Sequence, residues 1–510
     1  MYIIVVVLEM GIYISHTVWR YRFRKLRREA KESGKSIDEL ITRSKVDTLS
    51  ESILLAIDHL AVEYPYYSEF CAGCVIDALK NRHQRHPHLP TNYQLPSTPT
   101  TPDLCEQIHK NIIMSKHIAL PEIFSQIPRH QILYPNPSPI HSLPTLTPRS
   151  PPHPQISIFA KREDQSAPLA CAGNKYRKLE YIVPDILSAT PLHHSHENHP
   201  NTNTNTPAGP ATILVTEGAI QSNHTVQVAA LARKLGLKAL VLLSRGTGGG
   251  LRASQDPETF LRTGNVQINR LLGAEVRILD ENDPLASDAF PILEDLRAQG
   301  ERPYWIPGGA SIHPYGGLGY ARAAFEIAEQ ETEMELGGTG RFDFIFVACG
   351  SGSSVGGLIA GFRLLEARRE EADRRVRPRR SVIGVLNSPT RPRSYHEERV
   401  LRFAQRASAL IGLDSQRYIS ADDVKLDDRF VGSAYGVLDV ETKEAAEQMA
   451  RMEAVVLDPV YTAKVARGML QWIQEEEIRQ FARLHSLDKV NLLFIHTGGQ
   501  AALGAYADVN

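Results

Sequence analysis

The chain has 510 residues, a formal net charge of −1 and 42% hydrophobic residues. This length predicts two or three domains with sizeable cores, and the balanced charge excludes an overall basic, nucleic-acid-binding surface. A mean hydropathy of −0.25 argues against several membrane spans. Five scattered cysteines are typical of a reducing compartment. The pair Cys71 and Cys74 lacks a second ligand pair at zinc spacing, so buried cysteines are favoured over a metal site. We expect a soluble cytoplasmic protein, with a mitochondrial location left open.

Residues 1–118 form an extension whose sequence indicates no firm function. Residues 1–19 are mostly apolar and a basic run follows them, so this stretch is a candidate membrane anchor. A buried helix or strand, or a spurious extension of the chain, is the alternative. Apolar residues at helical spacing between 36 and 81 predict helices, and the Pro-rich stretch at 82–118 is typical of a linker.

From about residue 119 onward, continuous apolar strands alternate with helices. This pattern is typical of a parallel sheet covered on both faces and predicts a doubly wound α/β fold. A helix is expected from 284 to 299. The polar stretch 188–211 holds four closely spaced histidines without an apolar framework, which favours a disordered insertion over a metal site. The expected strands are 156–160, 211–216, 238–243, 274–279, 303–309, 342–348 and 381–386.

One lysine stands in an unusual place. Lys175 follows Gly173 and Asn174 at the start of a helix with an apolar stripe, where the helix dipole already contributes positive potential. That potential lowers the pKa of the ammonium group and helps to expose a free amine, which a Schiff-base lysine requires. Taken alone the signal is weak, because most lysines at helix starts are solvated surface charges.

Two further loops follow predicted strands, where parallel sheets bind ligands. The loop Gln221-Ser222-Asn223-His224 opens a helix and offers a hydroxyl and an amide together. The second loop, 349–357, is rich in glycine and serine, so its backbone N–H groups and hydroxyls can hold an anion at a helix N-terminus. It has neither a Walker lysine nor a G-x-G-x-x-G spacing, so a phosphate monoester fits it better than ATP or NAD. A plain strand–helix turn is the alternative.

The tail of the chain adds a last group of polar residues. Tyr461 and Thr462 open another helix, and the closing run His496-Thr497-Gly498-Gly499 ends another buried strand. Tyr435 lies on an irregular segment flanked by glycines, which suits a side chain that faces a ligand. A core tyrosine is the commoner outcome for either tyrosine alone. Together, however, the lysine, the Ser/Asn loop, the phosphate-sized loop and the late hydroxyl are what pyridoxal phosphate needs.

Five motifs, in order, resemble those of a known family: G-N-K-Y-R-K-L-E-Y, G-A-I-Q-S-N-H-T, A-C-G-S-G, L-D-P-V-Y-T-A-K and H-T-G-G. The family is that of the D-cysteine desulfhydrases and 1-aminocyclopropane-1-carboxylate (ACC) deaminases, fold-type II pyridoxal-phosphate enzymes related to the tryptophan synthase β subunit. The resemblance covers roughly residues 120–510. It implies a catalytic unit of two doubly wound α/β domains over 119–510, with the smaller domain inserted at about 175–315. It also implies pyridoxal 5′-phosphate as cofactor, a small amino-acid substrate and a homodimer.

The resemblance also implies a role for each matched residue. Lys175 would bind the cofactor as an imine, and Asn223 would hold its phenolic oxygen. Ser222 takes the position of a nucleophile or acid/base serine beside the substrate, and Tyr435 and Tyr461 match the two active-site tyrosines. The remaining matched residues are Ser351, Gly352, Ser353 and Ser354 at the cofactor phosphate, Thr462 near the pyridine nitrogen, and Gln221, His224, Thr497 and Gly498 at the substrate.

Two of these positions indicate which reaction to expect. ACC deaminases characteristically have Glu and Leu at the positions of Thr462 and Thr497. A carboxylate near the pyridine nitrogen deepens the electron sink that ring opening needs, whereas a hydroxyl suffices to remove an α-proton and expel a thiolate. We therefore expect α,β-elimination on D-cysteine, with ACC deamination as the alternative. An inactive binding protein is the alternative of another class, suggested by Ala219 and Val226, which depart from the family pattern.

Overall fold

The chain divides into two compact units, residues 1–106 and 107–510. The computed structural model describes only parts of the second unit, namely residues 118–132, 137–147, 154–192, 209–245, 249–280, 285, 288–311, 313–372 and 378–507. The candidate anchor, the helices expected between 36 and 81, and most of the polar insertion lie outside the described residues. Among the described helices, none combines the length and the apolar character that a membrane span requires.

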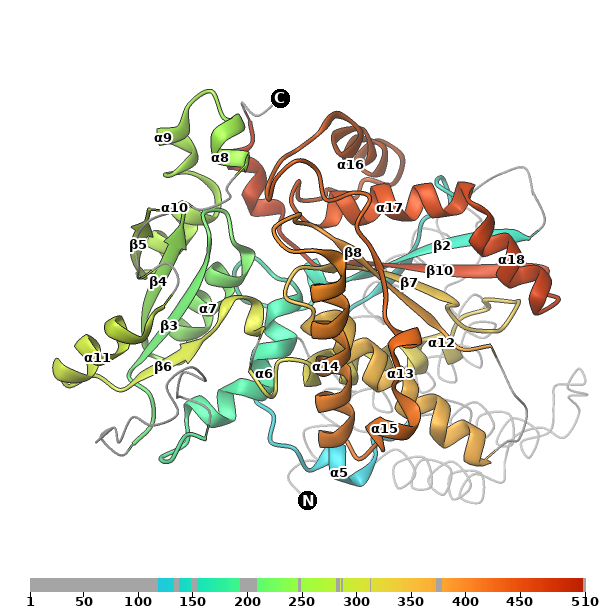
Figure 1. The fold of residues 1–510 in the computed structure, drawn as a ribbon, viewed down its shortest axis with the longest axis horizontal. Helices are drawn as coiled ribbons and strands as arrows, with labels where there is room; N and C mark the ends of the chain where they lie inside the picture. The colour runs from blue at the N-terminus through green and yellow to red at the C-terminus, as the bar shows by residue number, and fades with distance from the viewer. Residues whose placement is uncertain are drawn as a thin grey trace, which may run out of the picture. The chain divides into compact units, whose positions relative to one another are not determined.

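A six-stranded sheet forms the core of one lobe, here called the large lobe (Figure 1). Its strand order is β1-β2-β10-β7-β8-β9, and every neighbouring pair is parallel except β1 and β2. The antiparallel edge strand departs from the purely parallel sheet that was expected. Its connection to β2 contains no described helix, and a parallel neighbour would need a crossover element there. The strands are β1 (Ile140–Ser142), β2 (Gln155–Arg162), β7 (Phe344–Cys349), β8 (Ser381–Leu386), β9 (Lys425–Asp427) and β10 (Lys489–His496).

Helices cover both faces of this sheet because successive side chains of a strand point to opposite faces. On β7, Ile345 and Val347 pack in one core with α12 to α14, whereas Phe344 and Phe346 pack in another with α16 to α18. The first set is α12 (Leu318–Thr332), α13 (Ser353–Ala372) and α14 (Arg393–Leu410), and the second is α16 (Val440–Glu453), α17 (Thr462–Gln474) and α18 (Glu476–Leu484).

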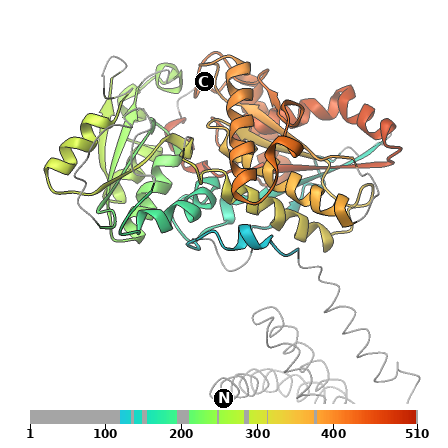
Figure 2. The same ribbon diagram turned by 60° about the horizontal axis from the view of Figure 1, so that its bottom comes forward.

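The small lobe is a fully parallel four-stranded sheet with the order β5-β4-β3-β6. Its elements lie between β2 and β7 in the sequence, and Figure 2 shows this lobe beside the large one. Helices α7 and α11 pack in the cores on its two faces. The elements are β3 (Ile213–Ala219), α7 (Asn223–Lys234), β4 (Lys238–Ser244), α10 (Gly264–Leu271), β5 (Glu275–Leu279), α11 (Phe290–Ala298) and β6 (Pro303–Ile306).

The α/β architecture predicted from the strand pattern is confirmed, and every expected strand has a counterpart. The helix expected from 284 is wrong at its start, because α11 begins at Phe290, next to Pro291, which favours the first turn of a helix. The pattern did not predict β1 or β9, which have three residues each. The short elements are α5 (Glu122–Ser125), η1 (Glu163–Gln165), α8 (Gly249–Ala253), α9 (Pro257–Phe260), η3 (Gly308–Ala310), α15 (Ser415–Tyr418), η4 (Ala421–Asp423) and η5 (Gln500–Ala505).

Helix α6 (Asn174–Ile186) carries the predicted lysine and lies between the two lobes (Figure 1). Its apolar residues Tyr176, Leu179 and Ile182 belong to the core of the small lobe. On another side it packs against α12, where a Cβ at Gly319 would come within 2.0 Å of the Arg177 carbonyl oxygen. Glycine is required there because α12 and α6 approach each other so closely, and this contact fixes the lysine helix on the large lobe.

Candidate active site

A cavity of about 480 Å³ opens where several strands end, between the two lobes. Segments that follow β3, β7 and β8 contribute to its wall, as expected for a ligand site at the carboxyl ends of parallel strands. Its volume is in the range of sites that hold small ligands. Ten of the residues predicted from the sequence line it: Lys175, Ser222, Asn223, His224, Ser351, Gly352, Ser354, Tyr435, Tyr461 and Thr497.

Lys175 occupies the first turn of α6, where four interactions involve this turn or the residue before it. The Gln227 side-chain oxygen accepts hydrogen bonds from the backbone N–H groups of Lys175 and Tyr176, both at 3.1 Å. Gly173 pairs with Gly498 on the tail loop, and the Asn174 side-chain oxygen accepts a hydrogen bond of 2.7 Å from the Lys175 ammonium. Burial lowers the pKa of Lys175 to about 8, against the opposing charge of Asp458. A useful fraction of its amine is therefore neutral near pH 8.

The Gly/Ser loop after β7 meets a second tight turn, at Gly309. The Ser351 and Ser353 hydroxyls lie 3.2 and 3.3 Å from the Gly309 carbonyl oxygen, to which both donate. Gly309 has φ of +66°, and a Cβ on it would come within 2.8 Å of the Ser351 Cβ. The two turns therefore form a close-fitting cradle of small residues at the start of α13, which is suited to an anion.

Lys178, one turn after Lys175, completes this cradle. Its side chain is buried, lines the cavity and donates to the Gly309 carbonyl oxygen at 3.2 Å. Burial, followed by the charge of Lys175, lowers the pKa of Lys178 well below the ordinary value. A buried ammonium in such a position gains a counter-charge when an anion binds beside it.

Two polar residues of the small lobe, Ser222 and His224, line the cavity and differ in their hydrogen bonding. Ser222 is the N-cap residue of α7, but its hydroxyl makes no capping hydrogen bond, so it is available to a ligand. The Thr216 hydroxyl donates to the Ile306 carbonyl oxygen at 2.7 Å and lies 3.0 Å from the His224 Nε2. Because that hydroxyl has only one proton, the His224 Nε2 must be the donor. Burial lowers the pKa of His224 well below its usual value, so its Nδ1 is an acceptor.

Two tyrosines stand together at the cavity wall. The Tyr435 and Tyr461 hydroxyls share a hydrogen bond, and the Lys175 ammonium lies 5.9 Å from the centre of the Tyr461 ring. Burial raises the pKa of Tyr461 to about 12 and that of Tyr435 well above its usual value. Both tyrosines are therefore protonated at neutral pH, and between them they can hold one proton directed at the cavity.

Four predicted site residues lie behind the wall of the cavity. Gln221 bonds the backbone of residues 260, 263 and 265, which fixes the loop rather than presenting a free amide. Ser353 is fully buried under the cradle, and Gly498 takes part through its backbone contact with Gly173. Thr462 is fully buried, donates to the Asp458 carboxylate at 2.7 Å and accepts from the Asp458 backbone N–H at 2.8 Å.

Comparison with known proteins bears on this arrangement. A family model described as "Pyridoxal-phosphate dependent enzyme" matches residues 133–485. This chain belongs to the pyridoxal-phosphate-dependent enzyme family. It is 36% identical over 354 residues to a 1-aminocyclopropane-1-carboxylate deaminase of Methylobacterium nodulans, covering 69% of this chain and 89% of that relative. It is 35% identical over 386 residues to a probable deaminase of the same name from Cryptococcus neoformans, covering 75% and 95% of the two chains.

A solved structure agrees with this assignment. The crystal structure of an ACC deaminase homologue is similar to this chain with a TM-score of 0.54 and 28% sequence identity, covering 76% of this chain and 98% of that one. The predicted fold-type II architecture and the predicted family are thereby confirmed, and pyridoxal phosphate is the cofactor of this family. The chain is an enzyme of this family.

The residues present fit pyridoxal phosphate. Glycine and serine residues of the two turns line the cavity at the start of α13, Lys178 supplies a buried amine that gains a counter-charge when an anion binds, and Lys175 supplies an amine of lowered pKa in the same cavity. Ser351 and Ser354 would hold the phosphate, and Asn223 would face the ring oxygen. These individual roles remain predictions.

Several residues of the site were not found from the sequence. Lys178 follows Lys175 at helical spacing, so the motif contained a signal for it. Gln227 and Asn265 act through contacts with residues more than 40 positions away, since Asn265 donates to the Asn223 side chain at 2.6 Å. No local pattern marks such partners, and only the packing of α7 against the lysine loop and of α10 against the Ser222 loop shows them.

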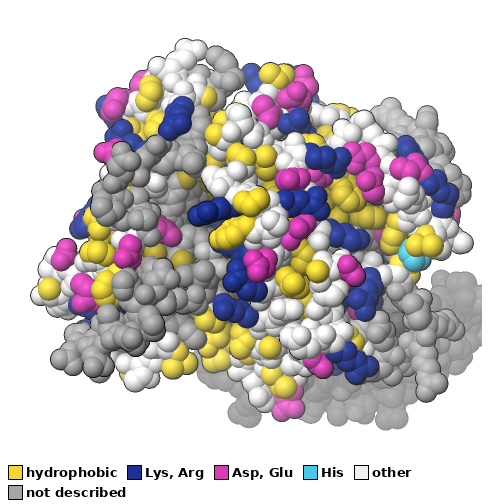
Figure 3. Space-filling model, viewed as in Figure 1, with side chains coloured by type: hydrophobic (Ala, Val, Ile, Leu, Met, Phe, Trp, Pro, Cys, Tyr) yellow, Lys and Arg dark blue, Asp and Glu magenta, His cyan; other side chains and the backbone are white. Residues whose placement is uncertain are grey.

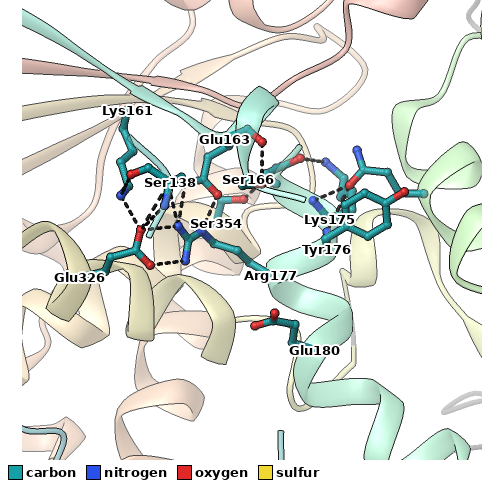
Figure 4. Close-up of polar contacts among 12 residues, drawn as sticks. Ser138, Lys161, Glu163, Ser166, Lys175, Tyr176, Arg177, Glu180, Glu326 and Ser354 are labelled. Carbon is teal, nitrogen blue, oxygen red and sulfur yellow. Dashed lines mark hydrogen bonds and ion pairs between the residues drawn. The ribbon is translucent and has the colours of Figure 1, made fainter. Parts of the chain in front are cut away.

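A buried ionic cluster anchors the lysine helix (Figure 4). The fully buried Arg177 of α6 forms ion pairs with Glu163 of η1 and Glu326 of α12, and Lys161 of β2 forms another with Glu326. The Ser138 hydroxyl donates to Glu163 at 2.7 Å and accepts from Arg177 at 2.9 Å. Two cations and two anions from four elements therefore balance one another two residues from Lys175, and they fix the orientation of α6.

Proposed function

We propose that this chain is a pyridoxal-phosphate-dependent deaminase that converts ACC and water to 2-oxobutyrate and ammonia. The names of the curated relatives at 34–36% identity support this substrate over D-cysteine, so the alternative considered from the sequence becomes the first candidate. The observation that carries the chemistry is the placement of Lys175, with its lowered pKa, in one cavity with Ser222 and the Tyr435–Tyr461 pair.

The cofactor supplies an electron sink when it is bound. The protein residues then have three tasks. Lys175, held by the Asn174 side-chain oxygen, provides an amine that can hold or release a proton near neutral pH. The Tyr435–Tyr461 pair holds a proton next to it, because burial keeps both phenols protonated. The Ser222 hydroxyl and the α7 N-terminus are placed to bind the substrate carboxylate.

D-cysteine is a second candidate, and one observation favours it. Asp458 is the carboxylate nearest to Thr462 in the chain, and its two oxygens accept hydrogen bonds from three backbone N–H groups and from the Thr462 hydroxyl. It is therefore not free to pair with a ring nitrogen. Without a carboxylate at that position the electron sink is weaker, which suits removal of an α-proton and loss of sulfide from the β-carbon. The products would then be pyruvate, hydrogen sulfide and ammonia.

One experiment separates the two candidates. The full-length protein, saturated with pyridoxal phosphate, is incubated separately with ACC, D-cysteine and L-cysteine, and 2-oxobutyrate, pyruvate and sulfide are measured. 2-Oxobutyrate from ACC is the expected result. Sulfide and pyruvate from D-cysteine with no 2-oxobutyrate would replace ACC by the second candidate. Lys175→Ala is the matched control, and product from this variant would contradict the role given to the lysine.

Two expectations about the whole protein remain proposals. We expect a homodimer, which sedimentation of the full chain tests directly. We also expect a cytoplasmic location, which fractionation of cells tests.

A further inference from the structure

Two guanidinium groups reach the active-site cavity, one from the segment before α14 and one from the second turn of this helix. Arg391, just before the helix, and Arg399 both line the cavity, and Tyr395 of the first turn lines it as well. The Arg391 and Arg399 Cζ atoms lie 5.7 and 6.0 Å from the centre of the Tyr395 ring. Within the described part of the chain, neither guanidinium forms an ion pair or a hydrogen bond. Their charge is therefore positioned by an aromatic ring but not neutralised.

A buried histidine lies beside this stripe. His396 lines the same cavity, is 6% exposed, and its Nε2 has no hydrogen-bond partner among the described residues. Burial and the charge of Arg399 lower the pKa of His396, so the ring is neutral and can carry its single proton on Nε2. An unpartnered buried N–H group is costly unless a ligand supplies an acceptor. The first turn of α14 also contains no acidic residue, so its positive end is not balanced locally.

Basic side chains outnumber carboxyl groups on the cavity wall. Lys175, Lys178, Arg391 and Arg399 line it, whereas the only carboxylate among its described lining residues is Glu217, whose pKa is raised by burial. Lys178 and the Gly/Ser loop suffice for the cofactor phosphate, and Lys175 is engaged by the cofactor itself. The Ser222 loop is the expected place of the substrate α-carboxylate. The two arginines, which stay charged at any accessible pH, have no assigned partner.

The arginines extend from the cradle to the rim of the cavity. Arg399 is half-buried and close enough to Lys178 to lower its pKa further, whereas Arg391, two helical turns earlier, is exposed. The space-filling view shows basic side chains gathered in the middle of this face, near α14 (Figure 3). An anion that entered the cavity would meet the exposed Arg391 before the half-buried Arg399.

We propose that Arg391, His396 and Arg399 form a second oxyanion subsite, which binds the acidic side-chain group of amino-acid substrates other than ACC and D-cysteine. Guanidinium groups bind carboxylate, sulfonate and phosphate oxygens in paired hydrogen bonds, so any of these groups fits. The proposal rests on the proposed function, because the subsite lies in the same cavity, and it extends the substrate class to acidic β-substituted amino acids. A free inorganic oxyanion has the same chemistry and is the other source of such a ligand.

The test compares ligands that differ only in the acidic group. The full-length, cofactor-loaded protein is titrated with serine, with O-phosphoserine and with inorganic phosphate, using both enantiomers of each amino acid, and the absorbance of the bound cofactor is followed. We expect O-phosphoserine to bind at least about tenfold more tightly than serine, as hydrogen bonds to charged groups allow. Arg391→Gln and Arg399→Gln should each reduce that preference several-fold. Arg406→Gln, an exposed charge on α14 outside the cavity lining, is the matched control.

Each outcome decides the proposal. In one outcome, inorganic phosphate displaces O-phosphoserine, and the two variants lower the affinity for each of these ligands equally. That result supports the subsite and identifies its ligand as a free oxyanion. Equal affinity for serine and O-phosphoserine overturns the proposal. Variants that bind pyridoxal phosphate less tightly place the arginines at the cofactor phosphate and also overturn it. If the unmodified protein turns over neither ACC nor D-cysteine but still binds O-phosphoserine more tightly than serine, the proposed function is contradicted and the subsite is not.

Discussion

The buried Lys161 and the largely buried Glu326 form an ion pair whose removal tests how α6 is held. Lys161 is 1% exposed and donates to Glu326, to the Ser138 carbonyl oxygen at 2.7 Å and to the Gln330 side-chain oxygen at 2.6 Å. Burial lowers the pKa of Lys161, and the charge of Glu326 opposes this shift. Arg177 and Glu163 form the other pair of the cluster. Replacing one member therefore leaves three charges of which one is unbalanced.

The cost follows from this imbalance. Breaking a buried pair by removing one partner costs about 3–5 kcal/mol, so Lys161→Met and Glu326→Gln should each lower the free energy of unfolding by about this amount. The double variant keeps Arg177 opposite Glu163, with one charge of each sign. It should therefore be less destabilised than the sum of the two single variants, by about 2 kcal/mol or more.

The assay is urea unfolding of the cofactor-free full-length protein, because bound cofactor would shift every midpoint by linkage. The exposed pair Arg393–Glu397 on α14 is the matched control, with a nitrogen–oxygen distance of 2.7 Å. Its double-variant cycle should give a coupling of only about 0.3–0.5 kcal/mol. A Lys161–Glu326 coupling no larger than that of the exposed pair would refute the account of the cluster.

The pH dependence of one variant adds a check. In Glu326→Gln, the charged Lys161 loses its principal counter-charge, so its pKa in the folded protein falls further below the ordinary value. As the pH rises through that folded pKa, the lysine loses its proton and the unbalanced charge disappears. The difference in the free energy of unfolding between this variant and the unmodified protein should therefore shrink as the pH rises from 7. A difference that grows with pH would contradict this sign.

Three further predictions concern the lysine loop and the tyrosines. The rate at which cofactor attaches to the apoprotein should rise up to about pH 8 and then level, because the neutral Lys175 amine reacts. With an ordinary lysine the rate would keep rising beyond pH 9. The Lys175→Ala variant should show no covalent attachment by mass spectrometry. Tyr461→Phe should lower kcat about 10²–10⁴-fold, as expected for a lost proton-transfer group, while cofactor affinity measured by absorbance titration changes little. Gly319→Ala should cost about 1–3 kcal/mol and weaken cofactor binding, because its Cβ would meet the Arg177 carbonyl oxygen at 2.0 Å. Gly504→Ala, whose nearest neighbour lies 3.9 Å away, should be nearly neutral in the same urea unfolding assay, and equal effects of the two would contradict the packing argument.

Local patterns predicted most of the architecture because buried parallel strands are continuous apolar runs. β7 and β8 are fully buried along their length, so their sequences differ clearly from those of the flanking helices. The three-residue strands β1 and β9 are too short to carry a periodic signal, and their place in the sheet depends on partners far along the chain. The predicted start of α11 was wrong for a similar reason, since an apolar stretch alone does not fix where a helix begins.

The sequence by itself was enough to identify four parts of the candidate site, namely the lysine, the Gly/Ser loop, the Ser222 loop and the two tyrosines. The residue types that the chemistry needs stand at the ends of predicted strands and helices. Only the tertiary structure decided which of them share a cavity. Thr462 and Gln221 turn away from it, because Asp458 and the backbone near Asn265 satisfy their hydrogen bonds. Lys178, Gln227, Arg391 and Arg399 join the site through the packing of α6, α7 and α14 around it. Such contacts depend on how elements pack across the whole chain, and no local pattern of residues encodes them.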